Sequence, residues 1–172
     1  MKRVSNRILV LVMILSLYTV AQASDFVTRG SAIVPGLRTG YSDSSSTRID
    51  SNSVFITNIT GSDVDVRMTV YDHDGNDITN YCSVKTGNTG SASPTIIASG
   101  TGEFELPAGN TRFVYCRAPT QGCYYGHGVI EWSSSDLNLR QALVAAGFHI
   151  YHWTVQNMRA AASISVNNGQ PF

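Results

Sequence analysis

Charged residues are scarce in this chain, since Asp, Glu, Lys and Arg together make up 14 % of its 172 residues. Lys and Arg form no cluster after residue 23, so the basic surface that a nucleic-acid-binding protein needs is missing. The chain also lacks a nucleophile elbow, a phosphate-binding loop and a zinc-protease motif. We therefore expect neither nucleic-acid binding nor catalysis.

Long apolar runs are also scarce, and the clearest one, at residues 8–15, has the features of a secretory signal peptide. Three basic residues precede it, and Ala-Gln-Ala at 21–23 is a small-x-small cleavage site. We expect a mature chain of residues 24–172 that is secreted or periplasmic and has no transmembrane segment. Without the leader, the chain has nine Lys and Arg and 12 Asp and Glu, which gives a net charge of −3.

The remaining sequence has the pattern of an all-β domain. The clearest strand runs over residues 63–71, where Val64, Val66, Met68 and Val70 alternate with polar residues. Such alternation places one face of a strand on the core and the other in water. Further strands are expected at 54–59, 95–98, 103–106, 111–116, 124–132 and 161–166.

Together these signals predict a single β-sandwich of roughly eight antiparallel strands over residues 24–172. Residues 35–52 are rich in Gly, Ser and Thr and predict a loop or loosely held arm, and 85–101 predict a long loop. The apolar stretch 140–153 fits a helix or a strand in its first half, so one short helix near 137–146 remains open.

Three cysteines follow the leader: Cys82, Cys116 and Cys123. Cys116 ends one predicted strand and Cys123 opens the next, so we expect a hairpin disulfide between them. Spacing alone leaves pairings with Cys82 open. In the preferred pairing Cys82 is a buried free thiol or forms an intermolecular disulfide.

Acidic residues are concentrated in the turn after the 63–71 strand. Asp72, Asp74 and Asp77 have the spacing of oxygen ligands in a calcium loop, but the chain has no glutamate at the loop's end. The simpler interpretation is a tight turn in which Gly75 takes a positive φ. No cofactor is therefore expected, with calcium as the alternative.

Aromatic and histidine residues supply the candidate ligand-binding set, which consists of Tyr124, Tyr125, His127 and Trp132. His127 lies between two glycines, which favours a bulge or a close backbone approach in this strand. His149 and His152 would lie on one face of a helix but on opposite faces of a strand, so a shared metal is expected only if that region is helical.

The order of features from Asn58 to Ser133 resembles a known type of domain. Asn58-Ile59-Thr60 leads into the alternating strand and the acidic turn, and the segments 106–112 and 125–130 follow. This order is similar to small bacterial β-sandwich modules of the sensory-rhodopsin-transducer-like type, and more loosely to immunoglobulin-like sandwiches. The resemblance implies a non-catalytic sandwich that oligomerises or binds a small ligand, and it carries over no functional residue. The leader and the cysteines depart from the transducer pattern, since those proteins act in the cytoplasm.

We therefore expect a secreted, non-catalytic structural or protein-interaction subunit of a cell-envelope or extracellular assembly. Its partner, another protein or a second copy, would bind an exposed strand edge or the aromatic face around Tyr124, Tyr125 and Trp132. The alternative is a carbohydrate-binding module, supported by calcium at the acidic turn.

Overall fold

The computed structural model describes residues 26–118 and 122–172, and in these residues the chain is almost entirely β-structure. The strands are β1 (Gly30–Tyr41), β2 (Arg48–Asn58), β3 (Val64–Tyr71), β4 (Cys82–Thr86), β5 (Thr95–Ser99), β6 (Glu103–Leu106), β7 (Thr111–Cys116), β8 (Cys123–Ser133), β9 (Leu143–Trp153) and β10 (Met158–Ser165), and the short 3₁₀ helices are η1 (Thr79–Tyr81) and η2 (Asn167–Gly169). The all-β prediction is confirmed. The predicted signal peptide lies outside the described residues. Within them, no helix is long and apolar enough to cross a membrane.

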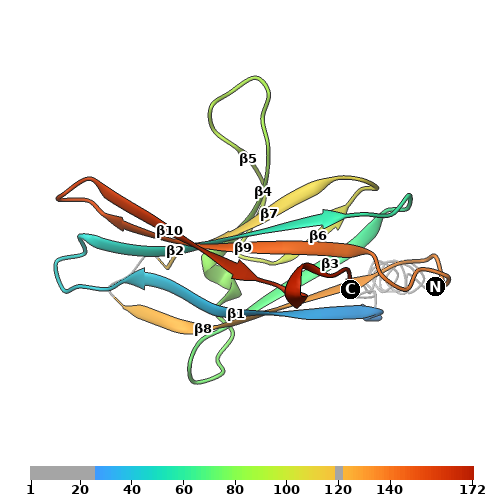
Figure 1. Ribbon diagram of the computed structural model, residues 1–172, viewed down its shortest axis with the longest axis horizontal. Coiled ribbons are helices and arrows are strands. Elements are labelled where there is room, and N and C mark those ends of the chain that lie inside the picture. The colour runs from blue at the N-terminus through green and yellow to red at the C-terminus, as the bar shows by residue number, and fades with distance from the viewer. Residues whose placement is uncertain (1–25, 119–121) are drawn as a thin grey trace, which may run out of the picture.

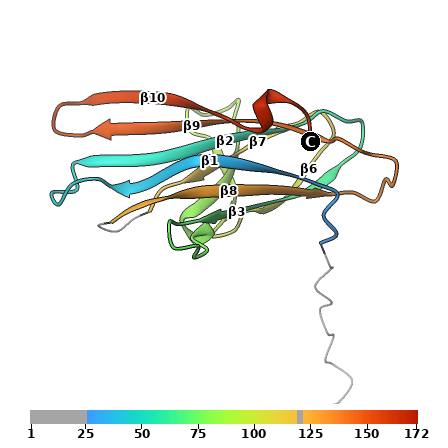
Figure 2. The same ribbon diagram turned by 60° about the horizontal axis from the view of Figure 1, so that its bottom comes forward.

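All ten strands belong to one antiparallel, hydrogen-bonded sheet that folds back around the core (Figure 1). One part has the order β5-β4-β7-β2-β9-β10 and the other has the order β1-β8-β3-β6. The two parts are joined at the β1–β2 hairpin, where Gly40 and Tyr41 pair with Asp50 and Ile49. Turned by 60°, the molecule shows β10, β9, β2, β1 and β8 side by side (Figure 2).

The core forms from the inward-facing residues of both parts of the sheet. The predicted alternation of β3 is confirmed, because Val64, Val66, Met68 and Val70 are all buried. Trp132 of β8 is fully buried beside them in the same cluster. Each such side chain contributes about 1.5–3 kcal/mol of hydrophobic stabilisation.

The interpretation of residues 35–52 as a loop is wrong, because they lie in β1 and β2 apart from the connecting turn. Their small residues are strand residues covered by larger neighbours, and Ser53 is buried between Tyr115 and Phe148 in the register. The turn is closed by Asp43, whose carboxylate accepts backbone hydrogen bonds from Thr47 and Arg48. Composition indicated a loop because Ser and Thr also favour turns.

Two other expectations are corrected. Residues 137–146 form no helix, and β9 begins at Leu143 as a strand paired along its length with β2. The long loop at 85–101 is shorter than expected, since β4 extends to Thr86 and the predicted strand at Thr95 is β5. Tertiary pairing overrides local propensity in apolar stretches of this kind. The β4–β5 hairpin projects from the body of the sheet (Figure 1).

The expected Cys116–Cys123 disulfide is wrong, and the structure pairs Cys82 with Cys116. These residues are direct neighbours in the β4–β7 register and both are buried. β7 and β8 do not form a hairpin, because β7 pairs with β2 and β4 whereas β8 pairs with β1 and β3. Cys123, not Cys82, is the free thiol.

Removing this disulfide should destabilise the fold substantially. The bridge joins residues 34 positions apart, and closing a loop of that length contributes about 3–4 kcal/mol in the chain-entropy model. We expect the double variant C82A/C116A to lose that amount in urea unfolding. The control C123A should stay within about 1 kcal/mol of wild type, and an equal loss in the control would contradict the assignment.

Candidate functional site

One edge of β2 is shared by two different strands. Its beginning pairs with β1 through Ile49 and Asp50, whereas from Asn52 onward the same edge pairs with β7. β1 and β7 therefore diverge at this point, and their backbone groups lose partners in the ladder. Buried backbone N–H and C=O groups without partners are costly, so side chains must replace the missing hydrogen bonds.

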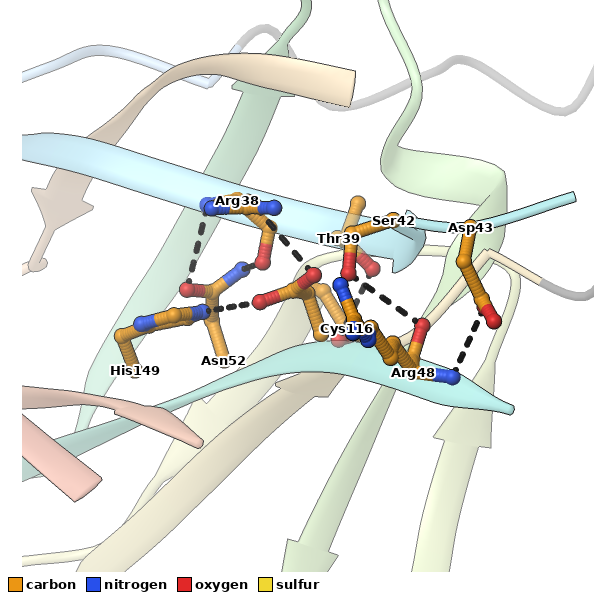
Figure 3. A network of polar contacts seen from close by, with 9 residues as sticks. Arg38, Thr39, Ser42, Asp43, Arg48, Asn52, Cys116 and His149 are labelled. Atoms are coloured by element: carbon orange, nitrogen blue, oxygen red, sulfur yellow. Dashed lines mark hydrogen bonds and ion pairs between the residues drawn. The ribbon is translucent and has the colours of Figure 1, made fainter. Parts of the chain in front are cut away.

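Two buried side chains provide these hydrogen bonds (Figure 3). The Asn52 amide accepts from the backbone N–H of Arg38 at 3.3 Å and donates to its carbonyl at 2.7 Å. The Thr39 hydroxyl donates to the carbonyl of Cys116 at 3.2 Å and accepts from the N–H of Ala118 at 2.9 Å. Asn52 and Thr39 thus supply the hydrogen bonds that the backbones of β1 and β7 lose where the two strands separate.

A charged group is buried at the same point. The Asp50 carboxylate is fully buried, with Arg38 Nε 3.2 Å from Oδ2 and His149 Nε2 2.8 Å from Oδ1. The Arg38 contact is an ion pair whose geometry does not meet that of a hydrogen bond. Burying a carboxylate is expensive unless it is paired, so Asp50 depends on side chains from β1 and β9.

Arg38 also contacts the free thiol of Cys123 and the ring of Tyr125. The guanidinium lies 5.1 Å from the centre of the Tyr125 ring, a distance typical of a cation–π contact. Burial opposes the charge of Arg38, but the hydrogen bond with Cys123 and the charge of Asp50 outweigh it and raise the pKa of the guanidinium. The hydrogen bond with Cys123 also raises the pKa of the Tyr125 hydroxyl.

We call Arg38, Asp50, Asn52, His149 and Cys123 the branch-point cluster. Within the described residues, the side chain of His149 hydrogen-bonds to Asp50 alone, and Cys123 hydrogen-bonds to Arg38. A nucleophile activated by histidine would need to lie within hydrogen-bonding reach of the ring. The arrangement is therefore suited to neutralising a buried charge.

The four predicted ligand-binding residues do not share one face, because they alternate along β8. Tyr125 is 52 % exposed, and the His127 ring stacks on Tyr71 at 5.3 Å. Tyr124 packs against the core and against Tyr81, where the hydrogen bond between the two hydroxyls raises the pKa of Tyr81. Trp132 is fully buried and is removed from any ligand-facing set.

The three carboxylates of the acidic turn are not brought together as metal ligands. Asp72 accepts hydrogen bonds from the backbone of Asp74 and Asn76 and from the Asn76 side chain, and Asp77 accepts from the backbone and hydroxyl of Thr79. No group of three His, Cys, Asp or Glu that could hold a metal occurs in the part of the chain that the structure describes. The hydrogen bonds organise the turn instead.

His149 and His152 lie on opposite faces of β9, as expected for a strand. His149 is opposite Asn52 and His152 is opposite Ile49, so their side chains alternate. A metal shared by these two residues would require the helix that the structure does not form.

Sequence reasoning missed an aromatic surface on the outer side of β7, β2 and β9. Phe55 stacks on Phe113 with ring centres 5.3 Å apart and meets Phe148 edge-on at 5.9 Å. Phe55 is 40 % exposed and Phe148 is 39 % exposed. Lys85 lies over the Tyr115 ring, with Nζ 4.2 Å from its centre. We call the strand positions that share this face with Phe55 the aromatic face.

The aromatic face contains no Asp or Glu at the strand positions that the register assigns to it. Its charged residues are Lys85 and, at one corner, Arg159. In contrast, the outer side of β3, β6 and β8 carries four carboxylates around Arg67, namely Asp65, Glu103, Glu105 and Glu131. The two outer surfaces of the molecule therefore differ in chemistry.

The edges of the sheet differ in the same way. Among the residues that the structure describes, the outer edge of β10 has no ladder partner, and the eight residues of β10 carry one charge, on Arg159. The edge strand β6 carries Glu103 and Glu105, and Glu103 forms an ion pair with Arg67 at 2.6 Å. Charged edge strands discourage pairing with another chain, whereas an edge with few charges permits it.

Comparison with models of protein families, with curated proteins and with solved structures found no match for this chain.

Replacing Asn52 should destabilise the fold by disrupting the junction. In N52L the N–H and C=O of Arg38 lose their partners, and each unsatisfied buried group costs about 1–3 kcal/mol. We expect a loss of about 2–4 kcal/mol in urea unfolding. S51A on the same strand, with no side-chain partner at the junction, should change stability by less than about 0.5 kcal/mol. Equal stabilities for N52L and S51A would show that the junction does not depend on this side chain.

Stability should also depend on pH through Asp72. The hydrogen bond from the Asn76 side chain outweighs the effect of burial and lowers the pKa of Asp72 below its ordinary value of 3.8. The ionised carboxylate therefore stabilises the folded state above that value, and the contribution is lost as the pH falls through the lower folded pKa. We expect wild type to exceed D72N in urea midpoint near about pH 6 and to lose that advantage near about pH 2. D74N, which alters an exposed carboxylate, should show no comparable change.

Proposed function

We propose that this protein is a structural or protein-interaction subunit of a cell-envelope or extracellular assembly, and that it binds its partner through the aromatic face. The observation that carries the proposal is the exposure of Phe55 and Phe148 on a face without carboxylates. Apolar side chains scattered singly over a surface are ordinary. Contacting rings on a face with few charges are typical of the core of a protein interface.

The unpaired edge of β10 borders the aromatic face and supports the same proposal. β10 pairs with β9 over all eight of its residues, so its backbone is held extended with one row of N–H and C=O groups unpaired in the ladder. Seven of these residues are exposed. A partner that covers the face can hydrogen-bond to this edge without any rearrangement of the subunit.

The cysteines and the leader support a function outside the cytoplasm. A buried disulfide between Cys82 and Cys116 is typical of oxidising compartments. The signal-peptide pattern of residues 1–23 leads to the same compartment. We therefore propose that the mature chain acts in the periplasm or outside the cell.

The proposal is tested by the native mass of the protein in extracts of the cells that produce it. Wild type should migrate as part of a larger assembly, and F148D should be released from it because a carboxylate would be buried against the partner. A central aromatic interface residue contributes about 2 kcal/mol or more, so we expect at least about tenfold less F148D in the assembly. I33D places the same charge on an exposed position of β1 (Ile33, 63 % exposed) and should assemble normally.

A carbohydrate-binding module is the second candidate, favoured by one observation. Tyr125 is exposed beside the Arg38 guanidinium, and a ring next to a hydrogen-bond donor is suited to a sugar. If wild type migrates alone, retains a glycan on an array, and loses it in Y125A, the subunit proposal is wrong and this alternative replaces it.

A further inference from the structure

We propose that the partner bound by the aromatic face is a second copy of this chain, packed face to face about a two-fold axis. This inference rests on the proposed function, because it names the partner of the same surface. A two-fold interface brings the same patch of both copies together, so the patch must be complementary to itself in size, shape and charge.

The size of the face matches that of a stable interface. Five neighbouring strands, from β4 to β10, span about 24 Å at the usual strand spacing, and the seven residues from Ser51 to Thr57 span about 24 Å along β2. The projected area is therefore about 580 Å² on each copy, or about 1,150 Å² for the pair. A specific interface needs about 1,000 Å² or more in total, and side-chain relief adds to the projected value.

Edge-to-edge pairing of two β10 strands buries much less. Eight residues of strand span about 27 Å, and the layer is about 10 Å thick. The pair would cover about 540 Å² in total, which is in the range of non-specific contacts. Area therefore favours the face over the edge as the main contact.

The shape of the face is complementary to itself across β2 and β9. Phe148 is opposite Ser53 in the register, and Phe55 is opposite Ala146. These four positions form a square on the face, with the two phenylalanines at the ends of one diagonal and Ser53 and Ala146 at the ends of the other. A two-fold axis through its centre can place the phenyl rings of each copy over the small residues of the other, as rings interleave between packed sheets.

Charge favours this arrangement over head-to-tail stacking. In a head-to-tail contact, Phe55 and Phe148 would cover the opposite surface of the next copy, where Asp65 and Glu105 would lose water without gaining a partner. In the two-fold contact no carboxylate enters the interface. Lys85 already lies over the ring of Tyr115 near the border of the face.

The experiment is sedimentation equilibrium of the purified mature protein in reductant, from about 1 µM to 500 µM, a range that covers the affinities of small interfaces. We expect a reversible monomer–dimer equilibrium. A146K fills one of the small positions and should weaken dimerisation by at least about tenfold. S31K makes the matched small-to-lysine change on the other outer surface, at an exposed position of β1, and should dimerise like wild type. Far-ultraviolet circular dichroism confirms that both variants fold.

Four outcomes would overturn the proposal. The first is a wild-type monomer at every concentration, and the second is a polymer that grows without limit, which indicates head-to-tail stacking. The third is a dimer unaffected by A146K, and the fourth is a dimer seen only without reductant, which indicates a disulfide through Cys123. If the purified protein is monomeric but F148D still leaves the native assembly, the proposed function stands and the partner is a different protein.

Discussion

The fold depends on one constraint, which is that a single edge of β2 serves two strands. A strand edge can pair with one neighbour at each position, so β1 must leave β2 where β7 arrives. Asn52 and Thr39 allow this exchange because their side chains replace the backbone hydrogen bonds that the diverging strands lose. The exchange directs β1 into one part of the sheet and β7 into the other, and the core forms between these parts.

The buried charge of Asp50 ties a third strand to the same point. Its carboxylate is neutralised by Arg38 of β1 and approached by His149 of β9, so strands far apart in the sequence must meet there. A buried ion pair is weak evidence for net stability, because desolvation offsets much of the attraction. Its clearer effect is on register, since sliding β9 by one residue would point His149 away from Asp50 and leave a buried charge without this partner.

The outer surfaces follow from that arrangement. Because β7 replaces β1 beside β2, Phe113 lies next to Phe55, and pairing with β9 places Phe148 within contact of the same ring. The acidic residues gather on the outer side of β3, β6 and β8, around Arg67. One fold therefore presents an aromatic surface suited to a partner and a charged surface suited to water.

The sequence by itself determined the all-β class, the buried face of β3 and the turn at Asp72, since these depend on alternation and turn chemistry within a few residues. It could not determine the disulfide partner of Cys116, because that depends on β7 pairing with β4 instead of β8. Nor could it determine the branch-point cluster or the aromatic face, whose members come from separate strands with no local signal of their own. Only the tertiary structure decided these features, because strand pairing brings together residues that are distant in the sequence, and local patterns carry no information about which strands will pair.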